Sequence, residues 1–437
     1  MNVKSVKKNN QNSLLNGILL LYHYPLNLNA STIMEYVNAF ERYSKFKVLK
    51  VNTAFGFPKA LKAAKFQTIV LHYSLFGTWP FMLNSDFLEY LNRCRRSYKI
   101  AIFQDEFQYC KQRFGFINHY KIDSIYTLIK PEYFKDVYRK YTSVSKIIHI
   151  PFSGYVSEEL IRSAKSIVSP DSKRKIDIGY RGRELAFYMG KGAREKYDIA
   201  AGFRERAKGL RLKNDIKTDE ESRIYGKDWY KFLADCRATL GAESGASIFD
   251  IDGTIYDEYL KAVKIDPKIT FNQMWEKFLH KWENNIPNRT FSQRHFEAAA
   301  LQTCQILFEG GYSGVMRPMV HYIPLRKDFS NFDEVIGLFK DGNFRRQIVK
   351  NAYQDLILSE RYTYKRFIEV FDMELLKGGF KPKPIDFDAD KNYALITKEL
   401  SFLYKKHILR KLYSKVLCMQ FPSRRSHNQL QEQRCAE

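Results

Sequence analysis

Short apolar runs alternate with longer amphipathic stretches through the first half of the chain. Runs of this length, rich in Ile, Leu and Val, are typical of parallel strands buried on both faces. The predicted strands are 17–22, 46–51, 68–72, 99–104, 124–127 and 147–151. Between the first two, apolar residues such as Ile33 and Val37 recur at helical spacing and predict a helix over 31–43, capped by Ser31 or Thr32. This alternation predicts an open α/β sheet.

A second α/β unit follows a polar segment, 166–175, whose composition and Pro170 predict an interdomain linker. The predicted elements are strands 176–180, 237–240, 305–308 and 321–324, helices 195–208 and 333–371, and a helical insert, 256–282. The fold class is therefore α/β, with two Rossmann-like domains facing across a cleft. The predicted boundaries are 1–170 for the first domain, 176–375 for the second, and 376–437 for a basic C-terminal helix and tail.

The C-terminal helix is predicted over 393–417 and is amphipathic. Apolar residues such as Ile396, Leu400 and Leu403 share one face, and lysines and arginines such as Lys405 surround it. This pattern is typical of a helix that docks on the core or of one that lies on a membrane surface.

Charge narrows the classes of partner. The formal net charge of +24 favours phosphates, anionic lipid surfaces or nucleic acid. No RRM, zinc-finger or KH signature accompanies the charge, so we expect no nucleic-acid partner. The six cysteines lack any C-x-x-C spacing, and no apolar run approaches the ~20 residues of a membrane span, so we expect free thiols and a cytoplasmic protein.

The segment 294–335 contains the most informative pattern. A helix bearing Glu297 runs into a strand, then a turn with Gly310 and Gly311, then another strand and a loop containing Ser330 and Asn331. Ligands of open α/β sheets bind at the carboxyl ends of strands, so this turn and this loop are predicted to face the crevice.

This segment resembles the donor-binding region of group 1 glycosyltransferases with the GT-B fold, whose F-E-A helix precedes a small-residue turn. Glu297 stands at the position of that family's ribose-binding glutamate. The family pairs it with an acid eight positions earlier, where this chain has Arg289. The resemblance implies that the second domain binds a nucleotide-sugar and the first domain binds the acceptor.

A basic, glycine-rich stretch, 176–196, precedes this region. Glycines let the backbone approach a diphosphate closely, and arginine side chains neutralise the charge of a leaving nucleotide. By resemblance, Arg181, Arg183 and Lys191 are the donor-binding candidates, with no metal or other cofactor. A solvated surface turn is the competing interpretation.

Polar residues also follow predicted strands of the first domain. His72 and Asp105 are predicted to face the cleft, where a histidine serves as base and a carboxylate positions an acceptor hydroxyl. His23 is a third candidate, and for each of them a structural role at a strand end is an equal alternative.

A competing motif, 247–254, reads SIFDIDGT and resembles the nucleophile loop of haloacid-dehalogenase-type phosphatases. There, Asp250 would attack phosphorus, Asp252 would act as acid and base, and Mg²⁺ would bind between carboxylates. From the whole sequence, the expected function is a glycosyltransferase with an unidentified acceptor, lipid-linked or glycan, in surface polysaccharide assembly. The alternatives are a Mg²⁺-dependent phosphohydrolase and a non-catalytic anion-binding protein. The charge also predicts contact with an anionic membrane at its inner face.

Overall fold

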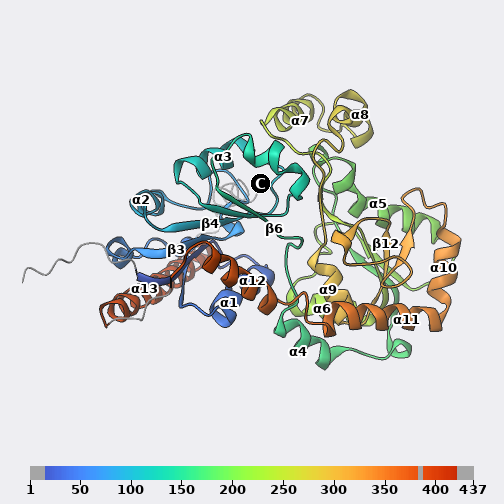
Figure 1. Cartoon of the computed structure of the whole chain (residues 1–437). Coiled ribbons are helices and arrows are strands. Elements are labelled where there is room, and N and C mark those ends of the chain that lie inside the picture. The colour runs from blue at the N-terminus through green and yellow to red at the C-terminus, as the bar shows by residue number, and fades with distance from the viewer. Residues whose placement is uncertain (1–14, 382–386, 421–437) are drawn as a thin grey trace, which may run out of the picture.

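The computed structural model describes residues 15–381 and 387–420, which form two α/β lobes lying side by side (Figure 1). The first lobe contains a six-stranded parallel sheet in the order β2-β1-β3-β4-β5-β6. The second contains a five-stranded parallel sheet in the order β13-β12-β9-β7-β8. In both sheets the strand order reverses beside the first strand of the lobe, which makes both doubly wound. The two Rossmann-like domains predicted from the sequence are confirmed, and the architecture is GT-B-like.

The first sheet consists of β1 (Leu15–Tyr22), β2 (Val48–Asn52), β3 (Phe66–Leu71), β4 (Tyr98–Ile102), β5 (Ser124–Thr127) and β6 (Lys146–His149). The helices that cover it are α1 (Ser31–Tyr43), α2 (Ser85–Arg93), α3 (Cys110–His119), α12 (Tyr364–Lys377) and α13 (Phe387–Gln420). All six strands overlap the apolar runs that predicted them.

The second sheet consists of β7 (Ile176–Arg181), β8 (Asn214–Lys217), β9 (Cys236–Gly241), β12 (Cys304–Phe308) and β13 (Ile323–Leu325). Its helices are α4 (Glu158–Ile167), α5 (Lys191–Arg206), α6 (Gly226–Asp235), α9 (Gln293–Ala300), α10 (Phe332–Lys340) and α11 (Gly342–Tyr353). An insert between β9 and β12 contains β10 (Ser244–Ala246), α7 (Thr254–Ile265), α8 (Phe271–Lys277) and β11 (Asn288–Thr290). The predicted helical insert corresponds to α7 and α8.

Strand β1 shows why continuous apolar runs predict this sheet. Ile18 and Leu20 point into the layer that includes α1, and Leu19 and Leu21 point into the layer on the opposite face. All four are fully buried. A strand between two helical layers needs apolar side chains at every position, since both of its faces are dry.

The chain crosses between the lobes twice. Helix α4 packs against α6 and α9 of the second lobe, although 158–167 was predicted to belong to the first domain. Helix α12 returns to the first lobe and packs on α1, where the Phe40 and Phe371 rings lie 5.0 Å apart. The C-terminal part of the chain therefore contributes helices to both lobes, α11 to the second lobe and α12 to the first.

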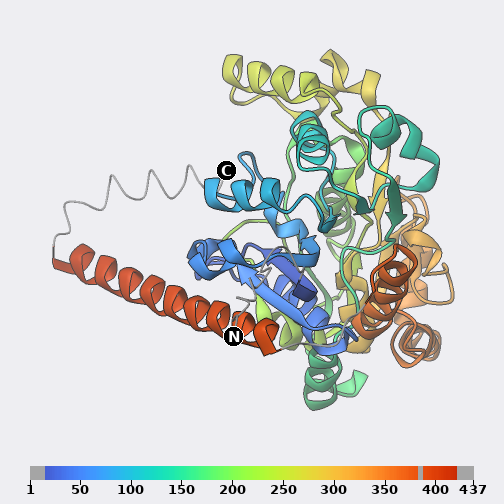
Figure 2. The same cartoon turned by 60° about the vertical axis from the view of Figure 1, so that its left-hand side comes forward.

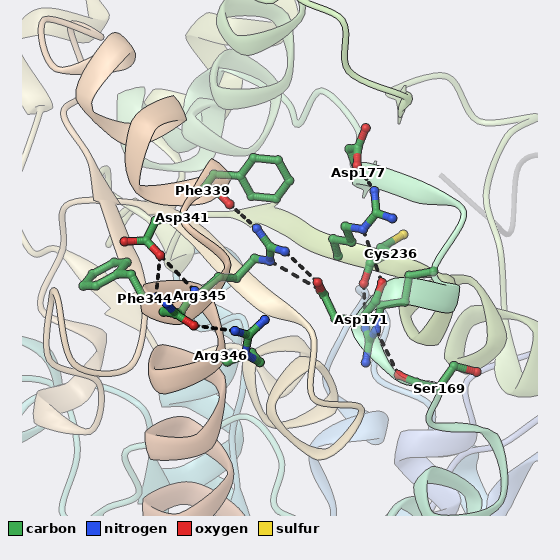
Figure 3. Close-up of polar contacts among 12 residues, drawn as sticks. Ser169, Asp171, Asp177, Cys236, Phe339, Asp341, Phe344, Arg345 and Arg346 are labelled. Atoms are coloured by element: carbon green, nitrogen blue, oxygen red, sulfur yellow. Dashed lines mark hydrogen bonds and ion pairs between the residues drawn. The ribbon is translucent and has the colours of Figure 1, made fainter.

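The predicted linker, 166–175, is fixed to the second lobe (Figure 3). Arg174 is buried and donates to the carbonyl oxygens of Cys236 and Leu301 at 2.6 and 2.9 Å. Asp171 pairs with Arg345 of α11 at 2.6 Å. The segment predicted as an interdomain linker is therefore held to the second lobe by hydrogen bonds and an ion pair.

Other expectations differ from the structure in local detail. Helix α1 begins at Ser31, and Ala30 is its N-cap, without a side-chain hydrogen bond. The helical region predicted over 333–371 is divided into α10, α11 with a π-helical turn at Gln354–Leu358, and α12, which begins at Tyr364. Strand β8 and helix α6 were not predicted. Residues 382–386, and the part of the predicted tail that spans 421–437, lie outside the described residues.

None of the helices within residues 15–381 and 387–420 combines the length and hydrophobicity of a membrane span.

Candidate functional site

A cavity of about 710 Å³ lies between the two lobes. The first lobe lines it with residues that follow β4 and β5, and the second lobe with the ends of β7 and β9. Strands β7 and β9 flank the point at which the order of the second sheet reverses. Ligands of open α/β sheets bind beyond the carboxyl ends of strands at such a point, so this cleft is the candidate site.

Five cations of the second lobe line the cleft, and two of them, Arg181 and Arg223, are paired with carboxylates. The other three are Arg183 after β7, Lys196 on α5 and Arg294 on α9. Among the described residues, the ion pairs of the structure include none of these three. Desolvation, followed by repulsion from Arg294, lowers the pKa of Lys196 to about 8. Positive charge is concentrated here, and no carboxylate of the described part of the chain pairs with these three cations, which suits an anionic ligand.

Asp105 of the first lobe also lines the cleft. It follows β4 and has a left-handed backbone, with φ 50°. Desolvation raises the pKa of Asp105, and the charges of Lys196, Arg113 and Arg183 oppose the rise. The carboxylate therefore lies in the electrostatic field of the cations across the cleft, and the structure places this predicted residue in the site.

Arg181 lines the cleft, but its guanidinium group is engaged elsewhere. It donates to Asp215 Oδ2 at 2.8 Å and stacks on the Phe232 ring at 4.3 Å. Its carbonyl oxygen accepts a hydrogen bond from Arg294. Of the predicted arginines, Arg183 therefore has the exposed side chain at the cleft.

Lys191, the third predicted cation, does not line the cleft. Its ammonium group lies 4.0 Å from the centre of the Trp275 ring in α8, and its backbone amide donates to Glu283 at 3.1 Å. The neighbouring Gly190 has φ 83°, and a Cβ atom there would lie 2.4 Å from Ser247 Oγ. The glycine-rich turn is thus needed for close packing against the insert.

Glu297 lies one layer behind the cleft. It is buried and accepts a hydrogen bond from Nε1 of Trp229 at 2.7 Å. Burial raises the pKa of its carboxyl group, and the Trp229 hydrogen bond opposes the rise. Trp229 itself lines the cleft, and the Arg294 guanidinium lies 4.9 Å from its ring centre. Glu297 therefore orients an aromatic wall of the site in this conformation.

The turn with Gly310 and Gly311 holds a carboxylate of the protein itself. Glu243, just after β9, accepts the backbone N–H of Tyr312 at 2.7 Å, and a Cβ atom on Gly310 would lie 2.9 Å from its Oε2 atom. Neither glycine lines the cleft. The turn does bind an anionic group, but that group is Glu243.

The polar loop with Ser330 and Asn331 also lies away from the cleft lining. Asn331 accepts from the Arg326 amide at 2.9 Å and donates to the Pro324 carbonyl at 3.0 Å. The Ser330 amide donates to Asp328 at 2.9 Å. These bonds shape the entry to α10, so the polarity of this loop has a local structural explanation.

His72 is fully buried and does not line the cleft. Its Nδ1 atom pairs with the Ser74 hydroxyl at 2.9 Å, and its ring packs against Tyr36. Burial lowers the pKa of His72 to about 3, which keeps the ring neutral at physiological pH. His23, the other candidate, pairs with Thr53 at 3.0 Å and is likewise absent from the cleft lining. The strand-end position was predicted correctly, but α1 and its neighbours cover it.

The Asp250 motif has a structural role. The two carboxylate oxygens of Asp250 accept the backbone amides of Gly253 and Tyr256, each at 2.9 Å, at the start of α7. Asp252 accepts the Thr254 amide at 3.0 Å. A phosphatase nucleophile needs a carboxylate free to attack, and Asp250 is not free. Within the part of the chain that the structure describes, no group of three or more His, Cys, Asp or Glu side chains is placed to hold a metal ion.

Lys196, Arg294 and Trp229 were not identified from the sequence. Arg294 precedes Glu297 by three positions, so helical geometry places both on one side of α9, and this spacing was a usable signal. Lys196 and Trp229 lie in helices whose orientation depends on tertiary packing, and no short motif marks them.

No protein-family model and no curated protein matches the chain. Among solved structures, similar ones include an alpha-glucosyltransferase in complex with UDP and a 13-mer DNA containing an HMU base, at 10% identity and TM-score 0.49, covering 82% of this chain and 99% of that one. Another is AviGT4, a glycosyltransferase involved in avilamycin A biosynthesis, at 12% identity and TM-score 0.42, covering 83% and 98%. A third is Anabaena Alr3699/HepE in complex with UDP and glucose, at 9% identity and TM-score 0.39, covering 83% and 99%. At these values the similarity transfers no residue role and no substrate, and the chain's own geometry must support the function.

Proposed function

We propose that the chain is a glycosyltransferase that binds a nucleotide-sugar in the interlobe cleft. One observation supports this proposal above the others. Arg183, Lys196 and Arg294 converge beside the switch point of the second sheet, and the acidic Asp105 faces them from the first lobe. A diphosphate is the anion that this position and this charge suit best.

In the proposed reaction, the bond between the anomeric carbon of the sugar and the diphosphate oxygen breaks, and a bond from that carbon to the acceptor oxygen forms. The cations stabilise the nucleoside diphosphate that leaves. Arginine and lysine near the leaving oxygen offset the negative charge that develops there. Asp105, on the opposite wall, positions the acceptor hydroxyl and accepts its proton. Closure of the lobes would exclude water and so favour the acceptor over hydrolysis.

The nucleoside is proposed to lie against the second lobe near Trp229. The Trp229 indole is fixed by Glu297, and Tyr225 extends the same wall with an exposed ring. Aromatic faces of this kind stack on bases and riboses. Glu297 then acts on the donor through Trp229, whereas the family resemblance implies direct contact with the ribose.

The acceptor is proposed to be a lipid-linked sugar or a glycan, as in assembly of surface polysaccharide. The support is the basic surface, with a formal net charge of +24, which would concentrate anionic acceptors and membranes. The expectation that nucleic acid is not a partner stays a prediction, as does the cytoplasmic location.

Thermal shift with UDP, GDP and their sugars tests the donor site directly. The variant Lys196→Met should lose the donor-induced rise in melting temperature. Lys191→Met is the matched control, because it removes a cation from the same helix outside the cleft, and it should keep the rise. Equal behaviour of the two variants would contradict the proposal.

A phosphate-release assay with and without Mg²⁺ separates the alternatives. The proposal predicts no Mg²⁺-dependent release that Asp250→Asn abolishes. Donor binding without sugar transfer to any acceptor, and without donor hydrolysis, would favour the non-catalytic anion-binding protein.

A further inference from the structure

Helix α13 has two apolar faces, and only one of them is covered by the protein. On the covered face, Tyr393 and Ile396 are buried, and the Tyr393 ring lies 5.6 Å from that of Phe66. Farther along, Tyr404 and His407 each lie 5.1 Å from the Phe55 ring. This face docks on the first lobe, which confirms one of the two roles predicted for the helix.

The opposite face displays large apolar side chains to solvent. Leu395, Phe402, Leu409 and Tyr413 are 50%, 65%, 66% and 68% exposed. The first three recur every seven residues, and Tyr413 follows Leu409 by four, so all of them lie along one stripe. We call these four residues the outer stripe. Exposed hydrophobic residues on an ordinary protein surface are scattered singly, whereas these four are aligned along one helix.

Basic residues border the outer stripe. Lys398, Lys405, Lys406 and Arg410 lie on the same helix and are exposed. The long stems of such side chains extend beside apolar groups while their charged ends remain in water. Apolar side chains bordered by lysine and arginine are the arrangement of a helix that lies in the plane of an anionic membrane surface.

The position of α13 leaves the outer stripe accessible. Figure 2 shows the helix running along the first lobe and beyond it, on the side away from the second lobe. The cleft lies between the lobes, so a surface that binds the outer stripe would not close the cleft.

Two other occupants fit these observations less well. A second copy of the helix would bring two rows of lysine and arginine together, and like charges at close range repel. The phosphates of a nucleic acid would contact the cations, but the apolar side chains of Phe402 and Leu409 would not contribute to phosphate binding. An anionic bilayer interacts favourably with both parts of the surface.

We propose that the outer stripe of α13 and its basic border bind the protein to the surface of an anionic membrane. The apolar side chains enter the boundary between headgroups and acyl chains, and the cations bind lipid phosphates and carboxylates. This attachment does not depend on the proposed transferase activity.

Co-sedimentation with vesicles tests the proposal with the full chain. Vesicles of phosphatidylcholine containing about one third phosphatidylserine should bind the protein at low salt, and vesicles of phosphatidylcholine alone should bind it at least about tenfold more weakly. The double variant F402S/L409S should lower binding to the anionic vesicles by at least about tenfold. The control L260S/I265S removes exposed apolar side chains from α7 and should bind as the unchanged protein does.

A charge reversal tests the basic border separately. K405E/K406E should abolish binding to anionic vesicles, whereas K264E/K268E, with the same change of net charge on an exposed part of the insert, should retain most of it. The donor-induced thermal shift should be unchanged in all four variants, so failure here is distinguishable from failure of the proposed function.

Three results would overturn the proposal. The first is no binding of the unchanged protein to anionic vesicles at low salt. The second is equal binding of F402S/L409S and L260S/I265S. The third is a dimer in sedimentation velocity, or tight binding to duplex DNA, that F402S/L409S alone abolishes, because the outer stripe would then serve a second copy or a nucleic acid.

Discussion

Replacement of Lys196 by methionine should stabilise the empty protein and weaken donor binding. The pKa of Lys196 is lowered from 10.5 to about 8, so its charged form is disfavoured in the folded state. Burying the charged lysine therefore lowers the free energy of unfolding. This loss of stability is complete below about pH 8 and disappears as pH rises from 8 to 10.5. The Lys196 side chain is partly accessible, so solvent screening reduces this loss. We therefore expect the variant to have a free energy of unfolding about 1 to 3 kcal/mol higher near pH 7.

The same variant should lose the charge-assisted contact to the diphosphate. A lysine and a phosphate about 4 Å apart attract by about 4 kcal/mol at an effective dielectric constant of about 20. After desolvation, we expect a loss of about 2 to 3 kcal/mol in donor binding, or about 30-fold to 150-fold in the Kd of the donor.

Urea denaturation without ligand, near pH 7 and again near pH 10, measures the first effect, and donor titration measures the second. Higher stability near pH 7 that diminishes near pH 10, together with weak donor binding, is the expected result. A variant that is less stable near pH 7 and still binds the donor would refute the reasoning, because Lys196 would then be a packing residue.

Three further predictions concern single side chains. Asp105→Asn should keep the fold, since asparagine tolerates the left-handed backbone, and should lower kcat by about 10²-fold to 10⁴-fold in a transfer assay with donor and acceptor extract. Burial raises the pKa of Glu35 to about 7, so ionisation of this side chain costs stability as pH rises from 4.5. Glu35→Gln should therefore raise the free energy of unfolding by about 1 to 3 kcal/mol near pH 8 and should change it little near pH 4. Thermal melts at both pH values check this prediction. Arg345→Met should destabilise the second lobe by about 1 to 3 kcal/mol, because it leaves Asp171 without its partner; Asp171→Asn, which removes the charge but keeps an amide, should cost less in urea titrations.

Much of the fold could be predicted because buried parallel strands leave a direct trace in the sequence. Strands β1 to β6 were each found from apolar runs, because both faces of that sheet are covered by helices. Strand β8 was not found, because its sequence NDIK is polar and it lies at the edge of the second sheet. The polar composition of 166–175 predicted a linker, but the buried contacts of Arg174 could not be inferred from that composition.

The candidate site could be predicted only in outline. Asp105 and Arg183 were found because strand ends in such sheets face the crevice. The orientation of Arg181, Glu297 and Gly310 was not predictable, because each is paired with a residue distant in the sequence. Sequence motifs identify which residue types gather at the sheet edge, while tertiary packing decides which of them face the ligand.

A crystal structure with a bound nucleoside diphosphate tests the central claim most directly. The claim predicts the diphosphate between the lobes, with its oxygens within hydrogen-bond distance of Lys196 and of Arg183 or Arg294. A nucleotide bound outside the interlobe cavity, or bound there with its phosphates directed away from these three cations, would contradict it.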